Sequence, residues 1–145
     1  MKLSWQAIGG KGIGSYLNVF ESNEMDMGTF KREDGYYSMK SIPVVSGFVG
    51  AQYDWSEQFS SSIVLGATHT FRQDKVYHCN ISRTMLDGAV NFFWNLSDYA
   101  YAGIEYMFVW RSVYDFSDLA PDMYPKFKNL HTSANRIALV VAYLF

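Results

Sequence analysis

Cysteine and long apolar runs are both scarce in this sequence. The one cysteine, Cys79, has no partner for an internal disulfide and cannot by itself form a metal site. No run of about 18 apolar residues occurs, which excludes a transmembrane helix. The start of the chain, MKLSWQAIGG, lacks the uninterrupted apolar segment of a secretory signal. If the protein is secreted, we therefore expect this chain to be either a mature form or a truncated one.

An excess of basic charge is also missing, and so are the usual motifs of enzymes. The net charge of −2 provides no basic field for phosphates, so nucleic acid is not expected as a partner. The sequence has no G-x-S-x-G element, and His69, His78 and His131 lack the spacing of a metal site. The glycines of segment 9–14 lack the third glycine of a dinucleotide-binding loop. We predict neither an enzyme nor a metal or cofactor site.

Aromatic residues, by contrast, are abundant. Phe, Tyr and Trp make up 18% of the chain, and Tyr and Trp are typical of membrane interfaces. Hydrophobic residues reach 49% although the mean hydropathy is only −0.09, so apolar and polar residues must be interleaved. In segment 99–111, YAYAGIEYMFVWR, one set of alternate positions is apolar and the other carries Glu105 and Arg111. This period of two predicts a β-strand between lipid and water.

Five further segments behave similarly, which gives six predicted strands. These strands are 2–9, 44–55, 59–72, 83–95, 99–111 and 135–145. Two of the connections are short, at 55–58 and 95–98. The other three are long, at about 10–42, 73–82 and 112–133. This alternation is typical of outer-membrane barrels, which have short periplasmic turns and long external loops. The predicted fold class is therefore all-β, an antiparallel transmembrane β-barrel segment, and residues 1–145 form one partial domain.

Large aromatic residues in the apolar set are predicted to form two girdles at the membrane interfaces. The periplasmic girdle contains Trp55, Phe59, Trp94, Tyr143 and Phe145, and the outer girdle contains Phe71, Phe108 and Trp110.

Several stretches resemble DcaP-like trimeric porins of the bacterial outer membrane. The segment NFFWNLSDYAYAGIEYMFVWR is similar to the penultimate hairpin of that family through Asn91, Phe93, Trp94, Asn95, Gly103, Glu105 and Tyr106. The segment at 9–17 resembles its G-x-G-I-x-x-Y motif through Gly10, Gly12, Ile13 and Tyr16. The run at 46–71 is similar to a strand and turn of the family. The ending NRIALVVAYLF resembles the assembly signal of outer-membrane proteins, with Tyr143 and the terminal Phe145.

The resemblance implies a homotrimeric, water-filled channel of about sixteen strands per barrel, with this chain supplying the C-terminal part. It implies passive diffusion of small hydrophilic solutes, organic anions among them. The implied partners are outer-membrane lipid and, through the last strand, the barrel-assembly machinery. The implied location is the bacterial outer membrane, and no cofactor is implied.

Polar side chains that point into such a barrel set its selectivity. The candidates are Arg83, Asp87, Asn91, Glu105, Arg111 and Arg136. The simplest interpretation is that these side chains solvate the lumen and pair with their neighbours. A sharper hypothesis is that Arg83, Arg111 and Arg136 form a basic ladder that draws anions inward.

Two other folds are compatible with the same pattern. A small closed barrel of about eight strands, with a structural or adhesion role, would use two extra strands within 16–41 and would fill its interior with its own side chains. A soluble β-sandwich or lipocalin-like binder would be soluble without detergent. Outward-facing Phe108 and Trp110 argue against the soluble alternative.

Overall fold

Six long strands and one short hairpin make up the described part of the chain. The computed structural model describes residues 1–13, 27–72, 82–97, 99–113 and 131–143. Within these residues the fold is all-β, as predicted, and no helix is long and apolar enough to cross a membrane. The strands are β1 (Lys2–Lys11), β2 (Met27–Lys31), β3 (Tyr37–Ser41), β4 (Pro43–Asp54), β5 (Phe59–Thr70), β6 (Ser82–Ser97), β7 (Ala100–Val113) and β8 (His131–Tyr143).

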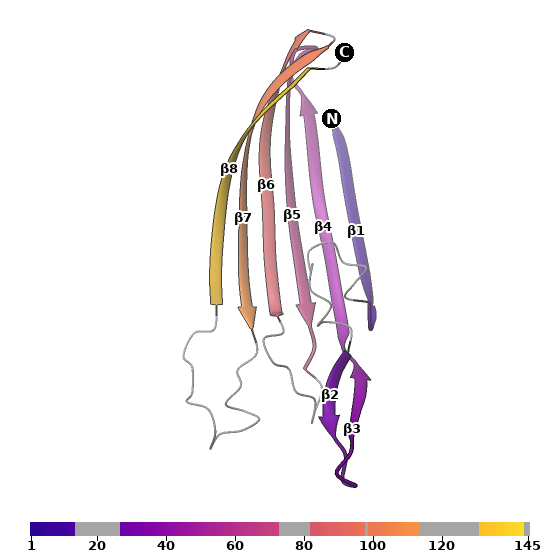
Figure 1. Cartoon of the computed structure of the whole chain (residues 1–145). Helices are drawn as coiled ribbons and strands as arrows, with labels where there is room; N and C mark the ends of the chain where they lie inside the picture. Colours follow the sequence, from indigo (N-terminus) through magenta and orange to yellow (C-terminus); the bar gives the residue numbers. More distant parts are fainter. Residues whose placement is uncertain (14–26, 73–81, 98, 114–130, 144–145) are drawn as a thin grey trace.

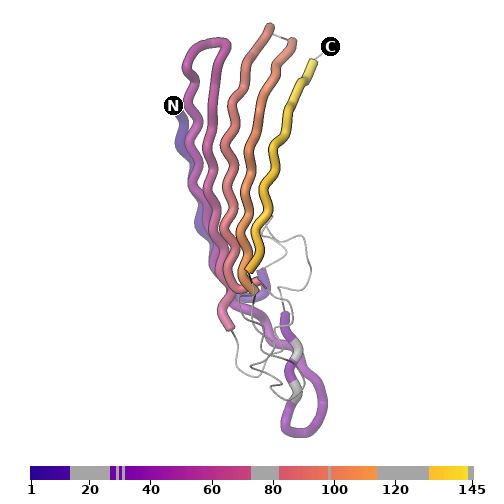
Figure 2. The backbone as a smooth tube through the Cα atoms, turned by 90° about the vertical axis from the view of Figure 1, so that its left-hand side faces the viewer, coloured from indigo at the N-terminus to yellow at the C-terminus, as the bar shows by residue number. Residues whose placement is uncertain are grey.

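The six long strands form one antiparallel sheet in the order β1-β4-β5-β6-β7-β8 (Figure 1). The strands lie side by side as a single twisted layer, and the β2–β3 hairpin extends beyond one end of it (Figure 2). The short turns, the N-terminus and the end of β8 all lie at the opposite end, which we call the turn end (Figure 1). The end with the hairpin is called the loop end.

All six predicted long strands are present, with changes at their ends. The last strand begins at His131 and not at residue 135, because its backbone pairing with β7 continues as far as Ser112 opposite His131. Residues 131–134 carry no apolar alternation that could have indicated this. A β-bulge between Ser82 and Thr84 interrupts the pairing of β6 with β7, and no residue pattern in this segment indicates it.

The β2–β3 hairpin falls inside the connection predicted at about 10–42. Its turn is closed by a hydrogen bond of 2.8 Å from the backbone N–H of Arg32 to the carbonyl oxygen of Tyr36. Gly35 in that turn has a φ of 86°, a conformation that glycine adopts without strain. The two strands form their own sheet and do not extend the six-stranded one. The eight-stranded alternative requires them to be part of the same sheet.

The pairing register assigns the residues of the six-stranded sheet to one of two faces, because directly opposed residues point to the same side. One face, called the apolar face, includes Leu3, Trp5, Val49, Ala51, Ile63, Leu65, Leu86, Val90, Phe92, Trp94, Ile104, Tyr106, Phe108, Trp110, Ile137, Leu139 and Val141. The other, called the polar face, includes Lys2, Ser4, Gln6, Ser46, Gln52, Asp54, Ser60, Ser62, Thr68, Asp87, Asn91, Glu105, Arg111, Thr132 and Arg136.

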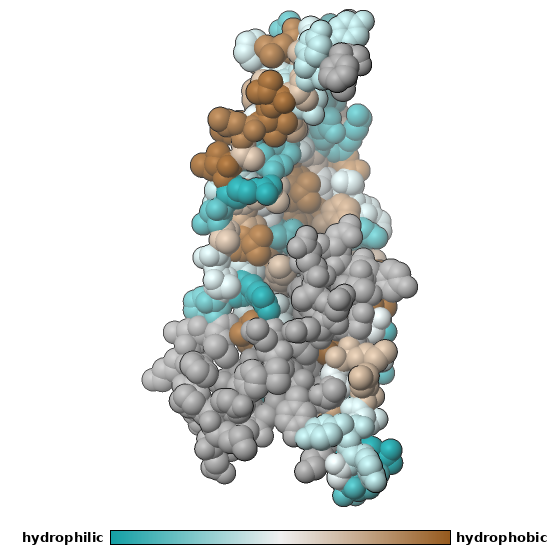
Figure 3. Space-filling view, viewed as in Figure 1, coloured by the Kyte–Doolittle hydropathy of each residue, from teal (hydrophilic) through white to brown (hydrophobic). Residues whose placement is uncertain are grey.

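The apolar face is the more exposed of the two. Leu139 and Val141 of β8 are 79% and 80% exposed. In β5, Ile63 and Leu65 are exposed, whereas Val64 between them on the polar face is only partly exposed. Ile42 and Val44 are the buried hydrophobic residues in the described part of the chain, so the sheet has almost no apolar core there. Hydrophobic side chains are accordingly visible at the surface near the turn end (Figure 3).

Candidate functional site

The polar face collects the charged side chains of the paired strands. Apart from Lys11 at the loop end of β1, the register places every charged residue among these pairs on this face. Three of them are basic and three are acidic: Lys2, Arg111 and Arg136 against Asp54, Asp87 and Glu105. The polar face formed by these pairs therefore has no net formal charge.

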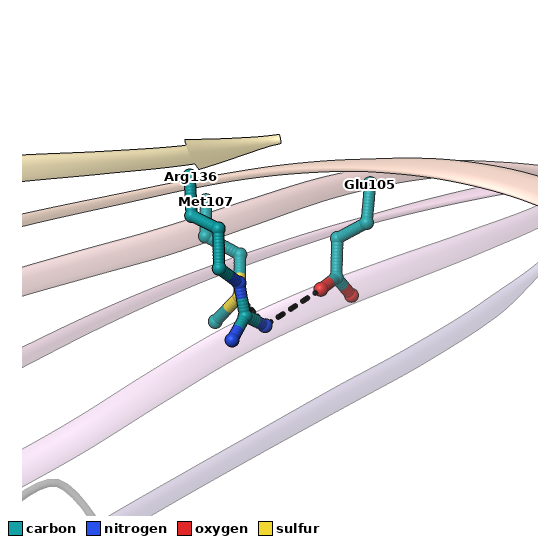
Figure 4. A network of polar contacts seen from close by, with 3 residues as sticks. All are labelled: Glu105, Met107 and Arg136. Carbon is teal, nitrogen blue, oxygen red and sulfur yellow. Dashed lines mark hydrogen bonds and ion pairs between the residues drawn. The ribbon is translucent and has the colours of Figure 1, made fainter. Parts of the chain in front are cut away.

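Arg136 and Glu105 form an ion pair between β8 and β7. One guanidinium nitrogen lies 3.3 Å from Glu105 Oε1 and 2.8 Å from the sulfur of Met107. All three side chains extend over the same side of the sheet (Figure 4). The Arg136 side chain is 66% exposed and that of Glu105 is 25% exposed. An ion pair this accessible to water adds little stability and leaves the guanidinium able to meet a solute.

Asp87 lies nearer the loop end and is held differently. Its neighbour across the strand pair is Gly66, where an added Cβ would lie 2.7 Å from Asp87 Oδ1. The carboxylate thus occupies the space that a side chain at position 66 would fill. Asp87 Oδ1 is buried and accepts no hydrogen bond from the described residues.

Uncharged polar side chains form a row across three neighbouring strands of the polar face, from near the turn end of β4 to the middle of β6. Gln52 on β4 lies opposite Ser62 on β5, and Ser62 lies opposite Asn91 on β6. We call these three residues the central belt. The Ser62 hydroxyl donates a hydrogen bond to Asn91 Oδ1. The register continues the row to Lys2 on β1 and to Glu105 on β7, so a charged residue lies at each end of the belt.

The structure brings together most of the residues singled out from the sequence. Asp87, Asn91, Glu105, Arg111 and Arg136 share the polar face. The remaining candidate, Arg83, lies in the bulge between Ser82 and Thr84 and has no register partner. Its side chain is exposed, but pairing does not assign it to the polar face. Lumenal and selectivity roles for these six residues stay predictions.

The other members of the row do not stand out in the sequence. Lys2, Gln52 and Ser62 were visible only as polar residues at alternate positions. Their alignment with Asn91 and Glu105 depends on the register of four strand pairs, which no single segment reveals.

The predicted girdle aromatics lie towards the two ends of the apolar face. Near the turn end, Phe59 stacks on Trp94 with ring centroids 5.9 Å apart. Trp55 lies in the neighbouring turn, and Tyr143 ends β8 on the same face. Near the loop end, Trp110 stacks on His131 with ring centroids 6.3 Å apart. Phe108 lies two residues closer to the turn end on β7, and Phe71 directly follows β5. Phe145 lies outside the described residues, and the interface role stays a prediction.

Known proteins offer no match to this chain. Neither a family model, nor a curated protein, nor a solved structure matches its sequence or fold. Among the described residues, no group of His, Cys, Asp and Glu side chains could hold a metal ion, and His78 and Cys79 lie outside them.

Proposed function

We propose that this chain forms part of the wall of a bacterial outer-membrane porin, through which small hydrophilic solutes diffuse passively. The observation that carries the proposal is the inverted exposure of the sheet: its apolar face is the more exposed one, and its charges lie on the other face. A soluble protein buries such an apolar face, whereas a barrel in a membrane turns it towards lipid and its polar face towards water.

The length of the apolar face along the strands supports a location in a membrane. On β7 it runs from Ala102, beside Trp94, to Trp110. At a rise of about 3.4 Å per residue and a strand tilt of about 40°, this segment spans about 21 Å of membrane thickness. That span fits the apolar band of about 25 Å on outer-membrane barrels, with aromatic residues at both of its edges.

The edges of the sheet call for more strands. Among the described residues β1 pairs only with β4, and β8 pairs only with β7. Outer-membrane barrels contain at least about eight strands, so these six require partners to close. We propose a DcaP-like barrel of about sixteen strands that assembles as a homotrimer. In this proposal Tyr143 and Phe145 form the signal for the assembly machinery. In the described residues β2 and β3 pair only with each other and not with the six-stranded sheet, so the small closed barrel is not favoured.

The tryptophans provide a test of lipid contact without any added label. The register places Trp5, Trp94 and Trp110 on the apolar face. The indole N–H of Trp55 donates a 2.9 Å hydrogen bond to Ser61, which lies on the same face. These are all four tryptophans of the chain. In vesicles of brominated phospholipid, we expect strong quenching of their fluorescence and little quenching by iodide.

A matched control uses one tryptophan on the opposite face. In a variant with all four tryptophans replaced by Phe, Val64→Trp should respond to iodide and not to brominated lipid, because Val64 lies on the polar face. Conductance in planar bilayers then tests the pore itself. Iodide quenching of the four native tryptophans in vesicles, or a closed barrel containing this chain that does not conduct, would contradict the proposed function.

A further inference from the structure

The central belt combines hydrogen-bond donors and acceptors without a charge. Gln52 and Asn91 carry amides, and Ser62 between them carries a hydroxyl, so each residue can both donate and accept. Two strand spacings separate the outer members, which makes the belt about 10 Å long. A solute that lies along it meets three uncharged polar groups in a row.

The charges around the belt do not favour an ion at its centre. At one end lies Lys2, and Asp54 accepts a 3.0 Å hydrogen bond from the Gln52 amide nitrogen there. At the other end lies Glu105, with Arg136 bound to it at 3.3 Å. The nearest basic and acidic groups therefore offset one another at the ends of the row. Recognition at the centre has to come from hydrogen bonds and shape, and not from net charge.

An aromatic ring borders the belt on its turn-end side. Phe93 is the next residue of β6 on the polar face after Asn91. Its ring lies over Gly103 of β7, where an added Cβ would collide with it, and it meets the Tyr101 ring edge-on at 5.9 Å. The ring is thus fixed in place and only partly exposed. An apolar platform beside convergent polar groups is the usual composition of a site for a small neutral ligand.

From this geometry, and resting on the proposed function, we infer that the central belt and Phe93 bind neutral polyhydroxylated solutes of about the size of a disaccharide. The solute's hydroxyl groups exchange hydrogen bonds with Gln52, Ser62 and Asn91, and its C–H face packs against Phe93. The site is weak, because each hydrogen bond to solute replaces one to water. Weak binding suits a channel that must also release its solute.

Nuclear magnetic resonance of the folded full chain in detergent micelles tests this binding directly. Sucrose is the probe, and the signals are the side-chain NH₂ groups of Gln52 and Asn91. We expect both signals to shift saturably with sucrose and not with the same concentration of potassium acetate. Asn135 is the internal control, because it lies on the apolar face, where its Oδ1 accepts a 2.9 Å hydrogen bond from Tyr106. Its signal should stay unchanged.

Substitutions then separate the belt from the rest of the wall. Asn91→Leu should raise the sucrose concentration needed to shift Gln52 about five-fold or more, the loss expected for one or more hydrogen bonds. Ser46→Ala, which removes a hydroxyl from a different row of the same face, should leave that concentration unchanged.

The outcomes distinguish this inference from the proposed function. If neither belt amide shifts with sucrose, or if acetate shifts them equally, the inference is wrong even when the protein conducts ions. If the amides shift saturably but a closed barrel containing this chain shows no conductance in bilayers, the binding site stands and the pore proposal fails.

Discussion

Gly88 and Phe108 show how closely single residues are fitted within the sheet. They lie directly opposite each other on β6 and β7. A Cβ at position 88 would collide with the Phe108 ring and approach Leu65 Cδ2 to 2.9 Å. The partly exposed Phe108 ring would have to move, and so would the end of the exposed Leu65 side chain. The absence of a side chain at position 88 is thus a packing requirement.

We therefore expect Gly88→Ala to lower the free energy of unfolding by about 1–3 kcal/mol, the usual cost of overpacking. Urea-induced unfolding in lipid vesicles measures this value. Gly9→Ala is the control on the same face, because its Cβ would meet only ordinary contacts at 3.7 and 3.9 Å. The double variant Gly88→Ala with Phe108→Leu should recover part of the loss. Equal effects of the two glycine substitutions would show that the Phe108 contact is not the cause.

At the scale of one strand, β5 contains both environments in adjacent positions. Ile63 lies on the apolar face and Val64 on the polar face, at nearly the same height. We expect Ile63→Arg to destabilise the membrane-inserted protein by about 2–4 kcal/mol, because its charge enters the hydrocarbon. Val64→Arg should cost much less, because its charge meets water. Urea titration in vesicles measures the difference in stability between the two variants. If Val64→Arg costs more than Ile63→Arg, the assignment of the two faces is wrong.

The same alternation explains why the strands could be predicted from the sequence. Segments such as 99–111 and 59–72 carry a period of two that survives local irregularities, so six strands and two faces follow from it. The bulge at Arg83 could not be predicted, because one extra residue changes no local composition. The central belt also could not be predicted, since it arises only when Gln52, Ser62 and Asn91 are brought into register. The short β2–β3 hairpin has too few residues for a clear period.

Across the whole sheet, the distribution of charge bears on selectivity. The three basic and three acidic residues of the polar face balance, so any bias must come from their positions. Arg111 lies near the loop end, opposite Met85, and Arg83 lies close by in the bulge. Arg136 lies deeper and is paired with Glu105. A solute that arrives from the loop end therefore meets basic groups first.

The triple variant Arg83→Gln, Arg111→Gln and Arg136→Gln should accordingly lower the anion-to-cation permeability ratio several-fold. Reversal potentials across a salt gradient in planar bilayers measure this ratio. Arg32→Gln serves as the control, because Arg32 lies in the hairpin turn, 3.2 Å from Asp34, and outside the sheet. An unchanged ratio in the triple variant would rule out the basic ladder.

The two open edges of the sheet also bear on the order of assembly. β1 and β8 present 10 and 13 residues, and each has a single strand neighbour in the described structure. In hydrocarbon, every backbone N–H or C=O without a partner costs several kcal/mol, so neither edge can enter the bilayer bare. Strand pairing therefore has to come before insertion, or coincide with it. For the proposed barrel, we therefore expect the rate of insertion to be set by the time that the two edge strands need to pair with their neighbours.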